Sequence, residues 1–168
     1  MAGPAVVLRD LESRDLESAW ELDQRCFEPG IAYSRSEIRS FLGRPGAIAL
    51  AAEIGGRFTG FAIADRRGVR GHIVTIDIAE SARRRGLGRR LFAAIFARLE
   101  EEGAREIRLE VDVRNAGAIH FYERLGFERT RVLRGYYGKG LDGYEMIRKG
   151  LRAPRSRPGS TRGSSSSG

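Results

Sequence analysis

A short run rich in arginine and glycine is the part of the chain best suited to chemistry. The run, Arg83-Arg84-Arg85-Gly86-Leu87-Gly88, follows an apolar stretch that ends at Ile78 and opens an amphipathic stretch that ends near Glu102. A strand, a glycine-bearing turn and a helix in this order are typical of phosphate-binding sites. The first turn of a helix presents unpaired N–H groups and partial positive charge. Glycines let a diphosphate approach the backbone, and arginines stay charged. We therefore expect residues 83–89 to hold a phosphorylated cofactor.

Two common phosphate-binding motifs do not fit this run. A dinucleotide-binding G-x-G-x-x-G would need a third glycine where Leu91 stands, and no Gly-Lys-Ser/Thr sequence of a P-loop is present. A solvated, arginine-rich loop at the start of a helix is the alternative interpretation. The residues that follow along the chain weigh against it.

Glu110 is a candidate general base. Apolar residues at 107, 109 and 111 alternate with polar ones, so Glu110 lies on the opposite face of a predicted strand. Ligands of open α/β sheets bind near the carboxyl ends of strands, where a carboxylate is well placed to act as a base. An α-amine titrates near pH 8, so a modest base is sufficient to deprotonate it. Arg108 and Asp112 share the face, and a merely solvated polar face is equally compatible with the pattern.

Asn115 and Tyr122 lie in the next predicted helix, two turns apart and roughly on one face. Asn115 is a good N-cap, and its amide can contact a cofactor while it caps. Tyr122 carries a phenol that can protonate a departing thiolate, because free thiol and phenol differ by about 1.5 pK units. Neighbouring apolar residues leave core packing as the alternative role for Tyr122, and simple capping is the alternative role for Asn115.

Other reactive side chains carry weaker signals. His72 and His120 lack a second ligand at metal-binding spacing, so no metal is expected. Cys26 is the single cysteine, which excludes an internal disulfide and favours a buried small hydrophobe. Tyr136 and Tyr137 beside a Gly-rich loop suit either a strand end packed on the core or the wall of a peptide-binding site.

The composition predicts one globular domain with a basic extension. The chain has 168 residues, 41% of them hydrophobic, and a net charge of +8. Residues 151–168 contain four arginines and no acid, so half of the excess charge lies there. We expect a folded domain over 1–150 and a disordered tail over 151–168. The remaining charge suits solubility and attraction of an anionic cofactor more than specific nucleic-acid binding. No apolar run approaches 18 residues and no signal-peptide pattern is present, which favours the cytoplasm and no membrane contact.

The elements that would position these residues can be located from periodicity and turn signals. The order is β-α-α-β-β-β-α-β-α-β-β, which predicts an α+β fold with a mixed, strongly twisted sheet. The strand–helix–strand segment 71–111 is a crossover unit, so its two strands should be parallel. The predicted strands cover residues 6–8, 47–54, 57–65, 71–78, 107–111, 127–136 and 144–148, and the predicted helices cover 15–26, 34–42, 87–102 and 115–125.

Two motifs together resemble a known family. Ile76-Asp77-Ile78 followed by Arg83-x-x-Gly86-x-Gly88 resembles the acetyl-CoA motif of the GNAT N-acetyltransferases. Residues 115–127 resemble the family's next signature, N-x-x-A-x-x-x-Y-x-x-x-G-F. The similarity covers roughly residues 5–149. It implies a GNAT-like fold, with about four helices around a seven-stranded mixed sheet that is splayed between its two parallel central strands.

Within that superfamily the chain looks most like the RimI-type branch, protein N-terminal acetyltransferases that modify a ribosomal protein. Leu109-Glu110-Val111 precedes Asn115 as in that branch, Tyr122 follows at the branch's spacing, and Arg134-Gly135-Tyr136-Tyr137 resembles its tyrosine-pair ending. The resemblance implies that Glu110 is the general base and Tyr122 the general acid. It also implies transfer of an acetyl group from acetyl-CoA to the N-terminal amine of a protein, such as a ribosomal protein, by direct attack.

The resemblance also assigns binding residues. The acceptor peptide would be contacted by Tyr33, Tyr136 and Tyr137. No metal is implied. The acetyl-CoA-binding residues would be Ile76, Asp77, Ile78, Arg83, Arg84, Arg85, Gly86, Leu87, Gly88, Arg89 and Asn115.

Three departures from the branch concern acceptor specificity. Asp77 stands where a small apolar residue is common, the loop 138–143 has an unusual sequence, and residues 28–33 match the substrate loop only loosely. A GNAT enzyme acting on a small amine or a lysine side chain is therefore the first alternative. A non-catalytic acetyl-CoA-binding or ribosome-associated module is the second, and the presence of both Glu110 and Tyr122 argues against it.

Overall fold

The computed structural model describes residues 3–151, and its elements follow the predicted order. The strands are β1 (Val6–Asp10), β2 (Ile48–Ile54), β3 (Arg57–Arg67), β4 (Arg70–Ile78), β5 (Glu106–Asp112), β6 (Glu128–Gly138) and β7 (Leu141–Lys149). The α-helices are α1 (Leu16–Cys26), α2 (Arg35–Leu42), α3 (Leu87–Glu101) and α4 (Ala116–Arg124), and two short 3-10 helices are η1 (Ser13–Asp15) and η2 (Glu80–Ala82).

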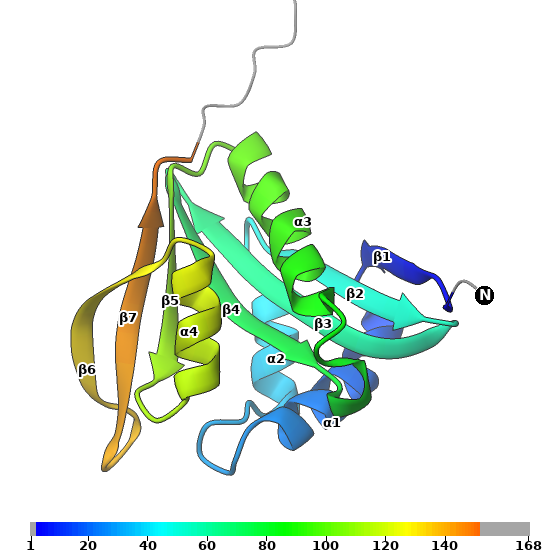
Figure 1. Ribbon diagram of the computed structural model, residues 1–168, viewed down its shortest axis with the longest axis horizontal. Helices are drawn as coiled ribbons and strands as arrows, with labels where there is room; N and C mark the ends of the chain where they lie inside the picture. The colour runs from blue at the N-terminus through cyan, green and yellow to red at the C-terminus, as the bar shows by residue number, and fades with distance from the viewer. Residues whose placement is uncertain (1–2, 152–168) are drawn as a thin grey trace, which may run out of the picture.

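The seven strands form one mixed sheet in the order β1-β2-β3-β4-β5-β7-β6. Every neighbouring pair is antiparallel except β4 and β5, which are parallel. Helices α3 and α4 lie over one face, and α1 and α2 lie over the other (Figure 1). The predicted α+β fold and the predicted parallel crossover are both confirmed.

The sheet opens between its two parallel strands. Pairing between β4 and β5 covers only Arg70 with Glu106, Gly71 with Ile107 and His72 with Arg108. Beyond His72 the two strands diverge toward their carboxyl ends (Figure 1). The predicted splay is therefore confirmed, and it leaves one edge of β4 without a strand partner where the cofactor motif lies.

A β-bulge at Val74 accompanies this opening. On β3, Ile63 pairs with Thr75 and the next residue pairs with Ile73, so Val74 is an extra residue on β4. A bulge bends its strand and increases the local twist. It also changes which side chains face which way, because one extra residue reverses the alternation. Ile73 and Ile76 consequently share the hydrophobic core under α3, although three positions separate them.

Two hydrophobic cores flank the sheet. The larger core lies under α3 and includes Leu91, Ile95 and Leu99 of that helix. The smaller core lies under α1 and α2 and includes Leu22 and Ile38. Ser34 begins α2 with a capping box, because its hydroxyl accepts from the N–H of Glu37 while the Glu37 carboxylate accepts from the N–H of Ser34.

The strand ends differ from the prediction by one to three residues, and two differences affect the loops and the core. The Gly-rich loop predicted over 138–143 is shorter, since β7 already begins at Leu141. Gly143 lies inside β7, where an added Cβ would be 3.3 Å from the Tyr137 ring. The prediction that the tail begins at residue 151 is wrong for Leu151, which is 6% exposed, packs in the larger core and donates its N–H to Arg105 O at 3.2 Å. The rest of the predicted tail lies outside the described residues. Within residues 3–151, no helix has the length and apolar character needed to span a bilayer.

Candidate active site

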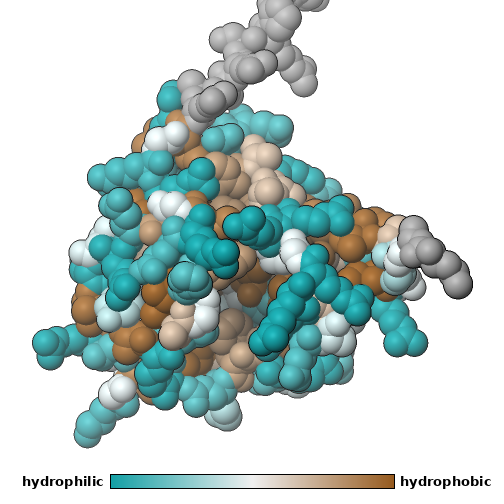
Figure 2. Space-filling model, in the orientation of Figure 1, coloured by the Kyte–Doolittle hydropathy of each residue, from teal (hydrophilic) through white to brown (hydrophobic). Residues whose placement is uncertain are grey.

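A cavity of about 1110 Å³ occupies the opening between β4 and β5. Its walls come from the carboxyl halves of both strands, the loop before α3, one side of α4, the end of α1 with the loop after it, and the end of β6. In Figure 2, polar side chains cover much of the face that carries α3 and α4, and apolar surface is visible between them. The elements that carry the sequence motifs therefore meet around one space.

The loop before α3 borders this cavity with free backbone donors. Gly86 is the N-cap of α3 and adopts a left-handed conformation with φ of +74°. No side chain caps this helix, so the N–H groups of its first turn are open to an anion. Arg84 is also left-handed, with φ of +64°, which is unusual for a residue with a Cβ. Gly86 and Gly88 both line the cavity, as the phosphate-binding prediction requires.

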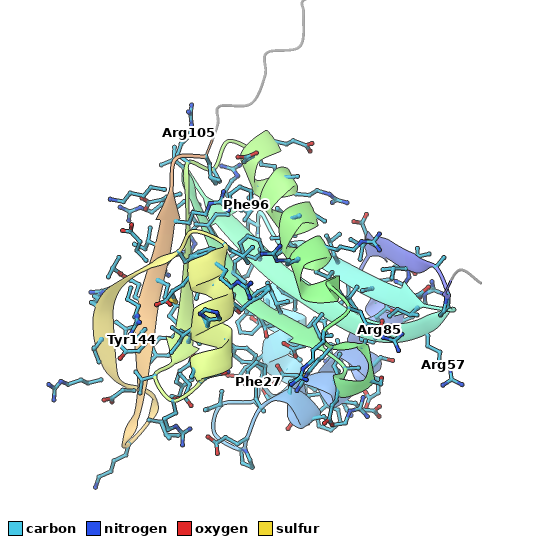
Figure 3. The ribbon with its side chains drawn as sticks, in the orientation of Figure 1. Phe27, Arg57, Arg85, Phe96, Arg105 and Tyr144 are labelled. Carbon is cyan, nitrogen blue, oxygen red and sulfur yellow. The ribbon has the colours of Figure 1, made fainter. Side chains whose placement is uncertain are left out.

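The four predicted arginines have different surroundings. Arg84 and Arg89 line the cavity. Arg83 also lines it, but its Nε donates to Ile78 O at 3.1 Å and so ties the loop to the end of β4. Arg85 does not line the cavity, and Figure 3 places it on the outer side of the loop. The Arg85 side chain can therefore attract an anion only from outside the cavity.

The carboxyl half of β4 lines the cavity through Val74, Thr75, Ile76 and Ile78. The Asp77 side chain does not line it; it is 1% exposed and packs next to Asp23 of α1. After the bulge at Val74, the side chain of Asp77 points toward α1, away from the cavity. Only the backbone of Asp77 is therefore left to contact the cofactor.

Glu110 reaches the cavity from β5 and is held by two basic groups. Its Oε2 is 2.6 Å from Nε2 of His72, and its Oε1 is 3.2 Å from Nε of Arg108. The Glu110 side chain is 10% exposed, against 47% for Arg108. This burial contradicts a freely solvated polar face. The contact with His72 could not be predicted from local patterns, because it depends on the register between β4 and β5.

Tyr122 packs against neighbouring aromatic rings and also reaches the cavity. Its ring packs on Phe121 and Phe127, with centroids 5.4 and 5.9 Å apart, and the residue also lines the cavity. The hydroxyl makes no hydrogen bond within the described part of the chain. Burial raises the pKa of the Tyr122 phenol, and the negative charge of Asp77 raises it further. The phenol is therefore protonated across the physiological pH range.

Asn115 caps α4 and also lines the cavity. Its Oδ1 accepts a hydrogen bond from the Ala118 N–H at 3.1 Å, so Asn115 caps α4 as predicted. The same side chain lines the cavity. Its amide nitrogen has no acceptor among residues 3–151, which leaves that donor available to a ligand.

Three tyrosines form the wall near Glu110. Tyr33, Tyr136 and Tyr137 all line the cavity, as predicted for acceptor-binding residues. The rings of Tyr136 and Tyr137 meet edge to face with centroids 4.8 Å apart, and Tyr33 meets Phe41 in the same way at 4.9 Å. Burial raises the pKa of Tyr136, and the nearby Glu110 carboxylate raises it further.

Some cavity residues were missed or misjudged from the sequence. Arg114 bridges two loops, since its guanidinium pairs with Glu28 after α1 and lies 2.6 Å from Asp112 Oδ2 at the end of β5. Nothing in the local sequence pattern marks this long-range pair. Cys26 is half-buried: it packs against the smaller core and also lines the cavity, with Sγ 3.6 Å from Ile78 O. Phe121, predicted only as an apolar neighbour, lines the cavity as well.

Comparison with known proteins places these motifs in a family context. Residues 16–127 match the acetyltransferase (GNAT) family. An N-alpha-acetyltransferase of Saccharolobus solfataricus is 42% identical over 80 residues, covering 47% of this chain and 48% of that protein. This chain thus spans about half the length of the first archaeal relatives that it matches.

Other relatives match over more of the chain. The [ribosomal protein bS18]-alanine N-acetyltransferase of Salmonella typhimurium is 34% identical over 129 residues, covering 76% of this chain and 84% of that protein. The crystal structure of the ribosomal-protein-S18-alanine N-acetyltransferase from Escherichia coli superimposes with a TM-score of 0.80 at 27% identity, covering 91% of this chain and 99% of that one.

Proposed function

The chain belongs to the acetyltransferase (GNAT) family, and from that premise we propose that it acetylates the N-terminal α-amine of a protein, such as a ribosomal protein. Enzymes of this family take the acetyl group from acetyl-CoA, so the chain is an acetyl-CoA-dependent N-acetyltransferase. One observation carries the choice of acceptor. The cavity has Glu110 and three tyrosines on the wall of β5, β6 and the α1–α2 loop, in a chain that is 34% identical to a ribosomal-protein-alanine N-acetyltransferase.

The donor side of the cavity is built for a diphosphate and an extended arm. The uncapped first turn of α3 offers its N–H groups to the diphosphate, and Arg84 and Arg89 add positive charge. The unpaired edge of β4 offers backbone hydrogen bonds to the amide groups of the pantetheine arm. Ile76 and Ile78 supply apolar contact beside that edge. Acetyl-CoA supplies the thioester, which this arrangement directs toward the opening between the strands.

Glu110 acts as the base for the incoming ammonium group. One of its oxygens contacts His72 and the other contacts Arg108, so the carboxylate is fixed in place. It accepts a proton from the amine directly or through a water molecule, and the free amine then attacks the thioester carbonyl. His72 lies at the position from which the proton can leave Glu110. No acyl-enzyme is required, which agrees with a cysteine that burial keeps in the thiol form by raising its pKa.

Tyr122 donates the proton that the departing sulfur needs. The raised pKa of Tyr122 keeps the phenol protonated, although it also increases the pKa difference between the phenol and a free thiol. Desolvation also raises the pKa of a thiol held in the same cavity, which narrows that gap again. The phenol therefore supplies a hydrogen bond to the sulfur as negative charge develops, and completes the transfer as the thiol leaves.

A peptide assay tests the proposal. Purified protein is mixed with acetyl-CoA and peptides that vary in the first residue, each containing one internal lysine. Matched peptides with a blocked N-terminus and a set of small amines complete the panel, and fragmentation by mass spectrometry locates the acetyl group. We expect acetylation of the free N-terminus alone, and its loss in Glu110→Gln. Modification confined to lysine or to small amines would contradict the proposal.

A further inference from the structure

Two buried carboxylic acids lie side by side behind the cavity wall and take no part in the mechanism above. Asp23 of α1 is 0% exposed and Asp77 of β4 is 1% exposed. The two side chains are hydrogen-bonding neighbours, although neither supplies a proton when both are ionised. A buried pair of this kind needs a physical explanation, because unpaired charges are unfavourable in an interior.

The hydrogen bonds of Asp23 and Asp77 show that one donor is missing between the two carboxyl groups. Asp77 accepts from the hydroxyl of Thr75, and Asp23 Oδ2 accepts from the backbone N–H of Tyr33 at 2.7 Å. The other oxygen of each acid, Asp23 Oδ1 and Asp77 Oδ2, has no donor within the described part of the chain. Two adjacent carboxyls cannot both ionise easily, so one of them retains its proton. That proton is the donor that the pair lacks.

We propose that a proton shared by Asp23 and Asp77 fastens α1 to β4 and, through the N–H of Tyr33, positions the acceptor wall of the cavity. Both acids are positioning residues, since neither side chain lines the cavity. The role in acceptor binding rests on the proposed function. The shared proton itself stands on burial and geometry alone.

The connection to the acceptor wall is short. Tyr33 lines the cavity, and the residue after it caps α2. Its backbone is held to α1 at two points, by the Asp23 carboxyl and by Gln24 Nε2, which donates to Tyr33 O at 2.7 Å. On the other side, Thr75 and Ile76 precede Asp77 on β4 and line the same cavity. Loss of the link between α1 and β4 therefore releases one wall relative to the other.

The charges around the pair set the direction of its pH response. Burial raises the pKa of Asp77 well above its usual range, the charge of Asp23 raises it further, and Thr75 and Arg83 oppose the rise. Burial also raises the pKa of Asp23, with Tyr33 N–H opposing and Glu37 adding a smaller increase. The other titratable groups that sense these charges are Cys26, Tyr33 and Tyr122. The stability that the link contributes is therefore fully present below the ordinary carboxyl pKa and is lost as pH rises through the raised pKa of the pair.

Asp23→Asn separates the proton from the geometry. Its amide oxygen still accepts from Tyr33 N–H, and its amide nitrogen offers Asp77 a donor at every pH. Glu21→Gln, an equivalent change at an exposed position of the same helix, is the matched control. We expect the melting temperature of free Asp23→Asn, relative to that of the wild type, to increase by about 3 °C or more as pH rises from 4 to 10. The control should follow the wild type. A difference that does not change with pH would overturn the shared proton.

Steady-state kinetics test the positioning role. We expect the wild-type KM for the acceptor peptide to rise at alkaline pH and that of Asp23→Asn to stay flat, with kcat and the KM for acetyl-CoA following the same pH course in both. Asp23→Ala should raise the acceptor KM about tenfold at neutral pH, because a buried hydrogen bond is lost. An unchanged acceptor KM in Asp23→Ala would refute positioning. A wild-type protein that acetylates no amine would refute the proposed function, and the melting profile would still decide the shared proton.

Discussion

Gly88→Ala is a sharp test of the diphosphate site, because the fold tolerates the added methyl group. Gly88 is the second residue of α3, and a Cβ there would lie 3.5 Å from Phe121 Cζ, which is ordinary van der Waals contact. Its φ is not positive, so alanine adopts it without strain. Alanine is favoured over glycine in a helix by about 0.5–1 kcal/mol. The melting temperature should therefore stay level or rise by about 2 °C.

Binding of acetyl-CoA should respond in the opposite direction. The added methyl faces Phe121 and Ile78, which both line the cavity, and it narrows the space over the first turn of α3. A hydrogen bond from N–H to a charged phosphate contributes about 1.5–3 kcal/mol. Displacing the diphosphate enough to weaken one such bond should raise the Kd for acetyl-CoA about 10- to 100-fold. Isothermal titration calorimetry measures this change directly.

Gly86→Ala is a companion variant in the same turn. Gly86 has φ of +74°, and an added Cβ would have no heavy atom within 4 Å. The substitution therefore strains the backbone by about 1–2 kcal/mol without filling the protein interior, and the melting temperature should fall. Because Gly86 also lines the cavity, this variant combines backbone strain with a methyl group in the ligand space, whereas Gly88→Ala adds the methyl group without strain. Wild-type affinity in a stable Gly88→Ala protein would refute the placement of the diphosphate on this turn.

Three further predictions concern the catalytic residues and the helix cap. Glu110→Gln should lower kcat about 10²- to 10⁴-fold while the Kd for acetyl-CoA stays within about twofold, because a general base contributes to the chemical step alone. Equal losses in kcat and in affinity for acetyl-CoA would show a binding role instead. Tyr122→Phe should lower kcat with little effect on the melting temperature, since the hydroxyl has no partner among residues 3–151. Because the pKa of Tyr122 is raised, the wild-type kcat should not fall between pH 9 and 10 through loss of the phenol proton. A Tyr122-dependent decline in kcat over that interval would contradict the assignment. Asn115→Ala should lower stability by about 1 kcal/mol through loss of the cap on α4, measurable by urea unfolding, and no change would mean that the cap is not needed.

Local patterns were sufficient to predict the elements. Alternation, helical spacing and turn residues placed every strand and α-helix in order, because each signal extends over a few neighbouring residues. The motif containing Gly86 and Gly88 likewise predicted a loop that borders the cavity. The splay between β4 and β5 followed from the family resemblance, and the structure relates it to the bulge at Val74.

Cross-strand register could not be obtained from the sequence. The single extra residue at Val74 places the Asp77 side chain on the α1 side, which strict alternation along the cofactor motif does not reveal. The contact between His72 and Glu110 joins positions 38 residues apart on parallel strands. The pair of Arg114 and Glu28 spans 86 residues and depends on two loops meeting across the cavity. Such contacts depend on tertiary packing, on which local propensity carries no information.

A crystal structure with a conjugate of CoA and an N-terminal peptide would test the central claim most directly. The account predicts diphosphate oxygens against the backbone N–H groups of residues 86–89, the pantetheine arm along Ile76–Ile78, and the peptide nitrogen between Glu110 and the thioester position. Tyr33, Tyr136 and Tyr137 should contact the peptide. A nucleotide bound elsewhere, or a peptide nitrogen remote from Glu110, would contradict it.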